Sequence, residues 1–284
     1  MRNPRLFLTK MKKVDFKKKL YKYWDASPDY YDIAEDVHAD LEAKRKELFT
    51  IIKKDGKVLD IACGSGVNRK DINEGVFYCG IDLSSVGLSA AKRANMNASF
   101  VKADAENLPV MSNSFDYIIS TNAVEHFIEP RAIFDEMWRV CKKGGYILLA
   151  FPNHGDYIFN YPPSLSYMMN LLSYRVTYVL KQFYRQTIRI FSKRIFFFAK
   201  IDVVPEVLIN TYLPDTDITY LASGREVRNY FDLLGASDIS VESKNHLYFA
   251  KPFPINILRN IYRIYKAVNP YYSWHGDTVL VIRK

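Results

Sequence analysis

Between residues 55 and 152, short apolar runs alternate with longer stretches in which apolar residues recur at helical spacing. The runs predict strands at 57–62, 77–82, 99–102, 115–120 and 145–151, and the stretches predict helices at 67–73, 84–96 and 131–142. This alternation is typical of a parallel sheet with crossover helices. We expect Ser84 or Ser85 to cap the second helix and Gly144-Gly145 to end the third.

Three further elements follow near the end of the chain. Residues 222–235 are predicted to form a helix opened by Ser223, and 237–242 and 277–283 are predicted to be strands. The expected fold is therefore α/β: a doubly wound, seven-stranded, mostly parallel sheet in one domain over residues 51–284.

Two segments do not fit this alternation. Residues 1–50 look largely helical and contain a Tyr-rich stretch at 21–32, and we expect them to cover the binding site of the domain. Residues 153–221 separate the fifth strand from the next helix, which is far longer than an ordinary connection, so we expect a functional insertion.

The composition is that of an ordinary globular protein: 284 residues, 49% hydrophobic and 25% charged. The three cysteines, at 63, 79 and 141, show no metal-ligand spacing. We therefore expect no metal and a reduced, cytoplasmic setting. The first 23 residues are basic and lack a continuous apolar core, so no signal peptide is expected.

The net charge of +9 is unevenly distributed along the chain. Residues 1–23 carry +8 and residues 155–200 carry +6, which leaves −5 for the remainder. The basic character therefore belongs to the two segments attached to the predicted sheet.

A glycine-rich turn follows the first predicted strand, in Val58-Leu-Asp-Ile-Ala-Cys-Gly-Ser-Gly66. Glycines at such a turn let the backbone approach a ligand closely. Asp82 comes 22 positions after Asp60, at the end of the second predicted strand, where a carboxylate can accept from both ribose hydroxyls of a nucleoside. The turn alone is a weak signal, since a tight turn or a nicotinamide-binding domain also uses glycines. Arg69 at the third glycine position disfavours the nicotinamide alternative.

Further motifs follow this turn in order: Gly80-Ile-Asp-Leu83, Ala103-Asp-Ala-Glu-Asn-Leu-Pro109, Ser114-Phe-Asp-Tyr-Ile-Ile119, Val124-Glu-His126 and Lys143-Gly-Gly-Tyr-Ile147. Together they resemble the class I S-adenosylmethionine-dependent methyltransferases. Within these they most resemble the type 11 group, which includes quinone and natural-product methyltransferases. The similarity covers roughly residues 56–152 and implies a Rossmann-like fold with S-adenosylmethionine as cofactor.

The resemblance implies a role for each motif residue. Asp60, Ala62, Gly64 and Gly66 would line the methionine and ribose portions of the cofactor. Asp82 would accept from the ribose hydroxyls, and Leu83 would pack against the adenine. Asp104 would accept from the adenine amino group, the Ala105 N–H would reach a ring nitrogen, and Asn122 would contact the methionine. For Asp60, capping of the following helix remains an alternative.

Methyl transfer needs a general base only when the nucleophile is protonated. His126 is the candidate base, because it follows the fourth strand at the cofactor-facing edge and titrates near neutrality. The alternative is that His126 only packs or hydrogen-bonds there. Tyr31 and His154 are candidate substrate residues.

Within the insertion, Lys181, Arg185, Arg189 and Lys193 recur every four residues and predict a basic stripe on one helix. The other side of that helix carries apolar residues: Leu180, Tyr184, Ile188, Phe191, Ile195 and Phe198. A basic amphipathic helix over 175–200 suits an anionic membrane surface, such as the inner face of a membrane. The alternative is a lid packed on the domain, with its basic side chains solvated.

The acceptor is expected to be a small, apolar or lipid-like molecule, methylated on oxygen, nitrogen or carbon. A macromolecular methyltransferase that grips RNA or protein through its basic segments is the second hypothesis. Nucleic acid ranks lower, because Asn122-Ala-Val-Glu125 stands where a base-methylating tetrad would lie. A non-catalytic scaffold of the same fold is the third hypothesis.

Overall fold

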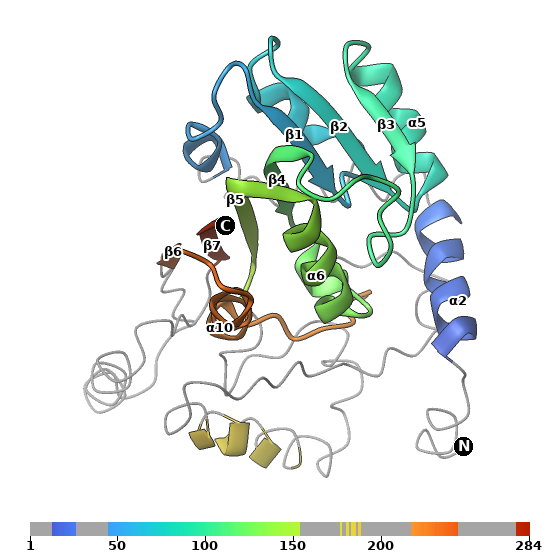
Figure 1. Cartoon of the computed structure of the whole chain (residues 1–284). Coiled ribbons are helices and arrows are strands. Elements are labelled where there is room, and N and C mark those ends of the chain that lie inside the picture. Colours follow the sequence, from blue (N-terminus) through green and yellow to red (C-terminus); the bar gives the residue numbers. More distant parts are fainter. Residues whose placement is uncertain are drawn as a thin grey trace, which may run out of the picture.

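The computed structural model describes residues 13–26, 45–153, 217–243 and 277–284, together with eight helical residues of the insertion: 177, 180, 181, 183–185, 187 and 188. A seven-stranded sheet forms the centre, with helices on both faces (Figure 1). Its strands are β1 (Lys57–Ile61), β2 (Phe77–Asp82), β3 (Ser99–Lys102), β4 (Phe115–Thr121), β5 (Cys141–Pro152), β6 (Asp238–Ser243) and β7 (Asp277–Arg283). The helical elements are α2 (Lys13–Ala26), η1 (Val67–Asp71), α5 (Ser85–Ala94), η2 (Val124–His126), α6 (Pro130–Val140) and α10 (Gly224–Leu234).

The strand order is β3-β2-β1-β4-β5-β7-β6. The first five strands pair in parallel, and β7 is antiparallel to both β5 and β6. The chain runs outward from β1 to β3 and then crosses back to β4, so the direction of winding reverses between β1 and β4. The doubly wound, mostly parallel sheet predicted from the sequence is confirmed. Ligands of such sheets bind at the carboxyl ends of the strands beside this reversal.

The predicted elements agree with the described ones in type and order, except at the first predicted helix and after the third. That helix, α6, ends at Val140, and β5 already begins at Cys141, so Gly144-Gly145 lie inside a strand. The prediction that these glycines end the helix is wrong. The helix stops earlier because the backbone N–H groups of Asn113 and Ser114 donate to the carbonyls of Arg139 and Val140. The predicted helix at 67–73 is a short 3-10 turn, η1.

Serine side chains cap two of the helices, as predicted. Ser84 Oγ accepts from the Gly87 N–H at 3.1 Å at the start of α5. Ser223 Oγ accepts from the Glu226 N–H at 3.3 Å at the start of α10. Each cap satisfies one backbone donor that the first helical turn leaves without a partner.

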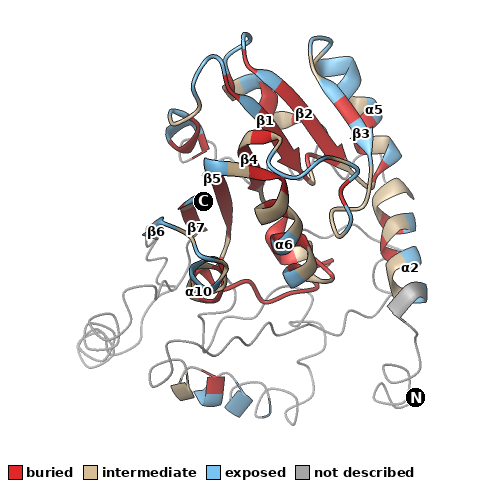
Figure 2. Cartoon of the chain, viewed as in Figure 1, coloured by how far each residue is buried: buried red, intermediate tan, exposed pale blue. Residues whose placement is uncertain are grey.

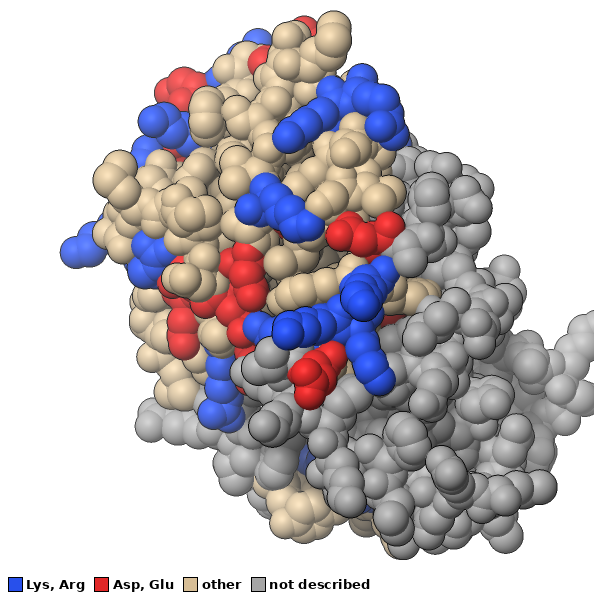
Figure 3. All heavy atoms as spheres, turned by 90° about the vertical axis from the view of Figure 1, so that its right-hand side faces the viewer, with Lys and Arg blue, Asp and Glu red and all other residues tan. Residues whose placement is uncertain are grey.

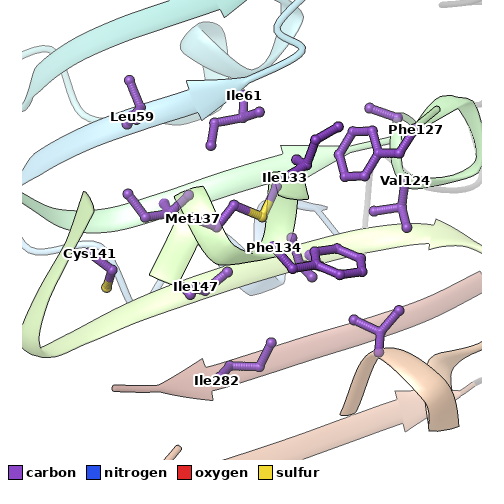
Figure 4. Packing of buried hydrophobic residues seen from close by; sticks show 14 of the residues in the cluster. Leu59, Ile61, Val124, Phe127, Ile133, Phe134, Met137, Cys141, Ile147 and Ile282 are labelled. Atoms are coloured by element: carbon purple, nitrogen blue, oxygen red, sulfur yellow. The ribbon is translucent and has the colours of Figure 1, made fainter. Parts of the chain in front are cut away.

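The central strands consist mainly of buried residues (Figure 2), and apolar side chains pack on both faces of the sheet. On one face, Ile133, Phe134 and Met137 of α6 pack over the strands with α10 beside them (Figure 4). On the other face, residues 48–49 and α5 cover Val58, Tyr78 and Leu148. Burial on both sides explains why the central strands read as continuous apolar runs. This packing fixes the strand ends from which the candidate site is built.

Candidate functional site

The predicted cofactor residues lie at or just after the carboxyl ends of β1, β2, β3 and β4, the strands on either side of the reversal in winding. Ala62 directly follows β1 and has φ 58°, and Asn122 directly follows β4 and has φ 51°. Non-glycine residues in the left-handed region are strained, and such residues cluster at binding sites. Both positions are among those that the sequence predicts for the cofactor.

Asp82 connects the glycine turn to the end of β2. Its carboxylate accepts from the Gly64 N–H at 2.8 Å and from the Ser84 N–H at 2.8 Å. Burial raises the pKa of Asp82, and the backbone N–H groups oppose that shift. The turn needs glycine at position 66, because its φ is 75° and an added Cβ would lie 3.0 Å from the Cβ of Ala91. The turn and the carboxylate thus form one rigid unit.

Asp60 lies fully buried beneath this unit. Its Oδ2 accepts from the Tyr78 hydroxyl and from Asn68 Nδ2, the latter at 3.0 Å. Burial raises the pKa of Asp60 to about 7, although both hydrogen bonds lower it. Asp60 therefore binds side chains, and the structure gives it no helix-capping contact among the described residues.

Two buried acceptors at this edge have no hydrogen-bond partner within the described part of the chain: Asp60 Oδ1 and Asn122 Oδ1. Leaving a buried acceptor without a donor costs about 1–3 kcal/mol. Such atoms are expected where a ligand supplies the missing donors. Two of them, beside a left-handed glycine turn and a buried carboxylate, indicate a polar ligand that carries donors.

The helix α2 lies across the same edge, and sequence reasoning did not identify its contacts. Lys17 Nζ is 2.5 Å from Glu106 Oε2 and 3.4 Å from Asp104 Oδ2, and the Tyr21 hydroxyl is 3.3 Å from that Asp104 oxygen. Asp25 accepts from the Ser85 N–H at 2.7 Å. These residues share one face of the helix through their three- to four-residue spacing. This spacing, which continues into the Tyr-rich stretch, was the sequence signal that could have identified these contacts.

His126 lies at the end of η2 with its side chain mostly buried. Its Nδ1 is 3.3 Å from both the carboxylate Oδ2 and the backbone oxygen of Asp217. Its Nε2 is 3.7 Å from Glu125 Oε1. Trp24 Nε1 of α2 donates to the same Asp217 carboxylate oxygen at 2.7 Å. Asp217 and Trp24 lie far from the sequence motifs, and no motif signalled their role.

The other predicted site residues are placed as follows. Leu83 and Ala105 are half-buried beside Asp82 and Asp104, at the ends of β2 and β3. Tyr31 and His154 lie outside the described residues, so the structure does not place them.

Two residues near the glycine turn have structural roles. Arg69, at the position of a third glycine, donates to the backbone carbonyls of Ile72 and Asn73 at 2.6 and 3.3 Å, and so holds the turn after η1. Cys63 is buried, and burial raises the pKa of its thiol well above the usual value. A buried, protonated thiol is a poor nucleophile.

Residues 59–149 match the family model of the type 11 methyltransferase domain. This segment is a class I methyltransferase domain. A demethylmenaquinone methyltransferase of Paenarthrobacter aurescens is 33% identical over 135 residues, covering 46% of this chain and 53% of that protein. A malonyl-[acyl-carrier protein] O-methyltransferase of Marinomonas is 29% identical over 149 residues, covering 50% and 55%. The chain thus spans about half the length of these relatives.

The fold of the methyltransferase domain also occurs in solved structures. An S-adenosylmethionine-dependent methyltransferase of Thermotoga maritima superposes with a TM-score of 0.55, covering 93% of this chain and 99% of that one, at 15% identity. At this identity the likeness concerns the fold alone.

The residues at the strand ends fit S-adenosylmethionine, the cofactor of this family. The cofactor carries an ammonium group, ribose hydroxyls and an adenine amino group, all of which are donors. The site offers carboxylates at 60, 82 and 104 and the unpaired Asn122 oxygen, all of which are acceptors. Donors and acceptors therefore match in kind.

Proposed function

We propose that this protein is an S-adenosylmethionine-dependent methyltransferase that acts on a small, apolar or lipid-like acceptor. The observation that supports it most is the pair of unpaired buried acceptors, Asp60 Oδ1 and Asn122 Oδ1, beside the Asp82–Gly64 unit. When bound, the cofactor would supply a methyl group from its sulfonium. The carbon–sulfur bond would break as the acceptor's nucleophile forms the new bond, and S-adenosylhomocysteine would leave.

In this proposal the chain's residues bind and orient. Asp82 would accept from the ribose hydroxyls with lone pairs that Gly64 and Ser84 leave available, and Leu83 would pack on the adenine. Asp60 and Asn122 would accept from the methionine end. Asp104 would accept from the adenine, with the Ala105 N–H beside it. Positioning of this kind supplies much of the rate enhancement of a displacement.

The helix α2 would cover the adenosine half of the site, as predicted for the N-terminal segment. Its support is the set of contacts from Lys17 and Tyr21 to Asp104 and from Asp25 to Ser85. These contacts bring one helix face over two motif loops. A cover of this kind excludes water from the reacting atoms.

His126 would be the general base for a protonated acceptor. Asp217 accepts on the Nδ1 side at 3.3 Å, which leaves Nε2 to take a proton. Glu125 Oε1, 3.7 Å from Nε2, would stabilise the imidazolium that forms. Because Trp24 donates to the same Asp217 oxygen, docking of α2 would help to hold the base in place. Asp217 is thus a positioning residue in this proposal.

The acceptor class rests on the aromatic composition of the insertion and on the relatives. One relative acts on demethylmenaquinone and another on malonyl-[acyl-carrier protein], so the family alone does not choose the acceptor. The insertion is rich in aromatic residues, which suits an apolar acceptor. No helix among the described residues is long and apolar enough to span a bilayer. We propose a cytoplasmic protein that meets the inner membrane face.

The cofactor assignment is tested by calorimetry with S-adenosylmethionine. The wild-type protein and Asp232→Ala, a matched change at an exposed carboxylate of α10, should bind alike. Asp82→Ala should weaken binding at least roughly tenfold, because two hydroxyl contacts to an ionised carboxylate are lost. Absence of wild-type binding, or equal affinity of Asp82→Ala, would refute the assignment.

The acceptor is tested with radiolabelled cofactor and three probes: reduced demethylmenaquinone, a total lipid extract and total RNA. Label in the quinol or the lipid fraction supports the proposal. Label in the RNA alone would favour the macromolecular alternative. On a labelled acceptor that carries an ionisable proton, His126→Gln should lower kcat about 100-fold or more with little change in KM. Unchanged turnover would remove the base assignment.

A further inference from the structure

We define the insertion helix as the helical residues described between 177 and 188. Its orientation differs from that of a helix whose basic stripe faces the solvent. Arg185, a member of that stripe, is only 8% exposed, and its Nη2 lies 3.6 Å from Oε1 of the buried Glu226. By contrast, Leu180 and Tyr184 of the apolar side are 63% and 62% exposed. The prediction that the basic side chains are solvated is therefore wrong for Arg185.

The buried ion pair explains this orientation. An arginine that leaves water needs a carboxylate partner, and Glu226 in the first turn of α10 provides one. Glu226 is itself 1% exposed, so rotating the helix to bury its apolar side would leave this carboxylate without that arginine. The pair thus holds Arg185 toward the domain, while Leu180 and Tyr184 lie on the outward side.

The outward side carries three large apolar residues within five positions: Leu180, Phe183 and Tyr184, each at least 62% exposed. Single exposed apolar residues are normal on a protein surface, but three neighbours on one helix face form a patch that indicates a binding surface. Lys181 beside them is also exposed, and none of the described residues of this helix is acidic.

The patch lies at the end of the molecule that carries the candidate site. Glu226 follows the segment 217–222, in which the N–H groups of Thr219 and Tyr220 donate to the carbonyl of Glu125, next to His126. In Figure 1 the insertion helix lies at the bottom of the molecule, on the side toward which β1, β2 and β3 point. The patch and the carboxyl ends of these strands therefore lie toward the same side of the molecule.

The exposed Lys181 beside the patch favours an anionic partner. On α2, Lys18, Lys19 and Lys22 are also exposed, although on the side of the molecule that carries α2, β3 and α5 lysine and arginine side chains lie among aspartate and glutamate side chains (Figure 3). A symmetric contact between two copies through this patch would bring two lysine-bearing faces together, which is unfavourable. Exposed Leu, Phe and Tyr with a neighbouring lysine match the apolar and headgroup layers of an anionic bilayer.

We propose that the insertion helix is a lipid-binding surface. Leu180, Phe183 and Tyr184 enter the interface of an anionic bilayer, and Lys181 lies among the headgroups. This binding is separate from methyl transfer. Only the delivery of an apolar acceptor from the bilayer to the site rests on the proposed function.

Vesicle flotation of the full chain tests the proposal. The wild-type protein should float with phosphatidylcholine vesicles that contain phosphatidylglycerol, and less with phosphatidylcholine alone. Replacing Leu180, Phe183 and Tyr184 together by serine should lower the partition coefficient at least roughly tenfold. The matched control is Met96→Ser with Met111→Ser, two apolar residues that are 90% and 80% exposed elsewhere, and it should float like the wild type.

Two further variants separate the contribution of charge to membrane binding from that of the apolar residues, and membrane binding from cofactor binding. Lys181→Glu should reduce flotation with anionic vesicles and leave the weaker binding to neutral vesicles unchanged. Asp82→Ala should float like the wild type even if it loses the cofactor, so failure of the methyltransferase proposal would be seen separately. Equal flotation of the triple variant and the wild type would overturn the proposal. So would a wild-type dimer that the triple substitution dissociates while neither protein floats, because the occupant would then be a second copy.

Discussion

Replacing Asp60 by asparagine should remove a pH-dependent loss of stability that the wild-type protein carries. Asp60 is fully buried, and burial raises its pKa from 3.8 to about 7. Below about pH 3 the side chain is protonated in both the folded and the unfolded chain, so it does not oppose folding. As the pH rises toward 7, the unfolded chain releases this proton while the folded chain retains it, and stability falls.

The size of this effect follows from the two pKa values. The difference between 3.8 and about 7 corresponds to about 4 kcal/mol of unfolding free energy once the pH exceeds the folded pKa. Most of it, about 3 kcal/mol, develops between about pH 5 and pH 8. An asparagine side chain cannot ionise. The stability of Asp60→Asn relative to the wild type should therefore increase by about 3 kcal/mol over this interval.

Urea unfolding at the two pH values, followed by circular dichroism, measures this difference. Any constant cost of the new amide cancels, because only the change with pH is compared. Tyr78→Phe provides a control of opposite sign. The Tyr78 hydroxyl donates to Asp60 and lowers the pKa of Asp60, so removing this hydroxyl should make the unfolding free energy fall more steeply with pH. In the double variant, Asp60→Asn with Tyr78→Phe, this site should cause no fall of the unfolding free energy with pH. If the difference in unfolding free energy between Asp60→Asn and the wild type is the same at both pH values, the buried carboxylate does not titrate as inferred.

Four other outcomes follow from the structure. Gly66→Ala should lower the unfolding free energy by about 1–3 kcal/mol in urea titrations, since it combines a left-handed φ with a close Cβ contact. Phe134→Ala should lower the unfolding free energy by about 3–5 kcal/mol in the same assay, because the ring of this α6 residue is fully buried in the core. Tyr21→Phe should raise the dissociation constant for S-adenosylmethionine about threefold to tenfold by calorimetry, if the hydroxyl holds Asp104. Cys63 should resist alkylation by iodoacetamide in native protein and react on unfolding, as mass spectrometry would show.

The sheet and the motif loops could be predicted from the sequence because the signals are local. Apolar runs such as 77–82 mark strands buried on both faces, and Gly64 and Asp82 lie at the ends of such runs. Helix starts followed from single capping serines at 84 and 223. Each of these signals lies within a few residues of the structure that it specifies.

The rest of the site depends on contacts between distant segments, which no local pattern encodes. The bond from Trp24 to Asp217 joins residues 193 positions apart. The amphipathic pattern of the insertion helix defines two faces but not which one meets the domain. That choice depends on Glu226, which is 41 positions beyond Arg185. The end of α6 was misplaced for the same reason, since Asn113 and Ser114 from an earlier loop take its last carbonyls.

The bond from Trp24 to Asp217 also has a consequence for the order in which the protein forms during synthesis. The helix α2 leaves the ribosome before the strands of the sheet, but the Trp24 indole cannot reach its acceptor until residue 217 has emerged, after every strand from β1 to β5. Contacts of such high sequence separation form late. The contact between α2 and residue 217 therefore forms only after the intervening strands have been synthesised. A nascent chain stalled within the insertion would carry the strand ends of the site while the arrangement around His126 remained incomplete.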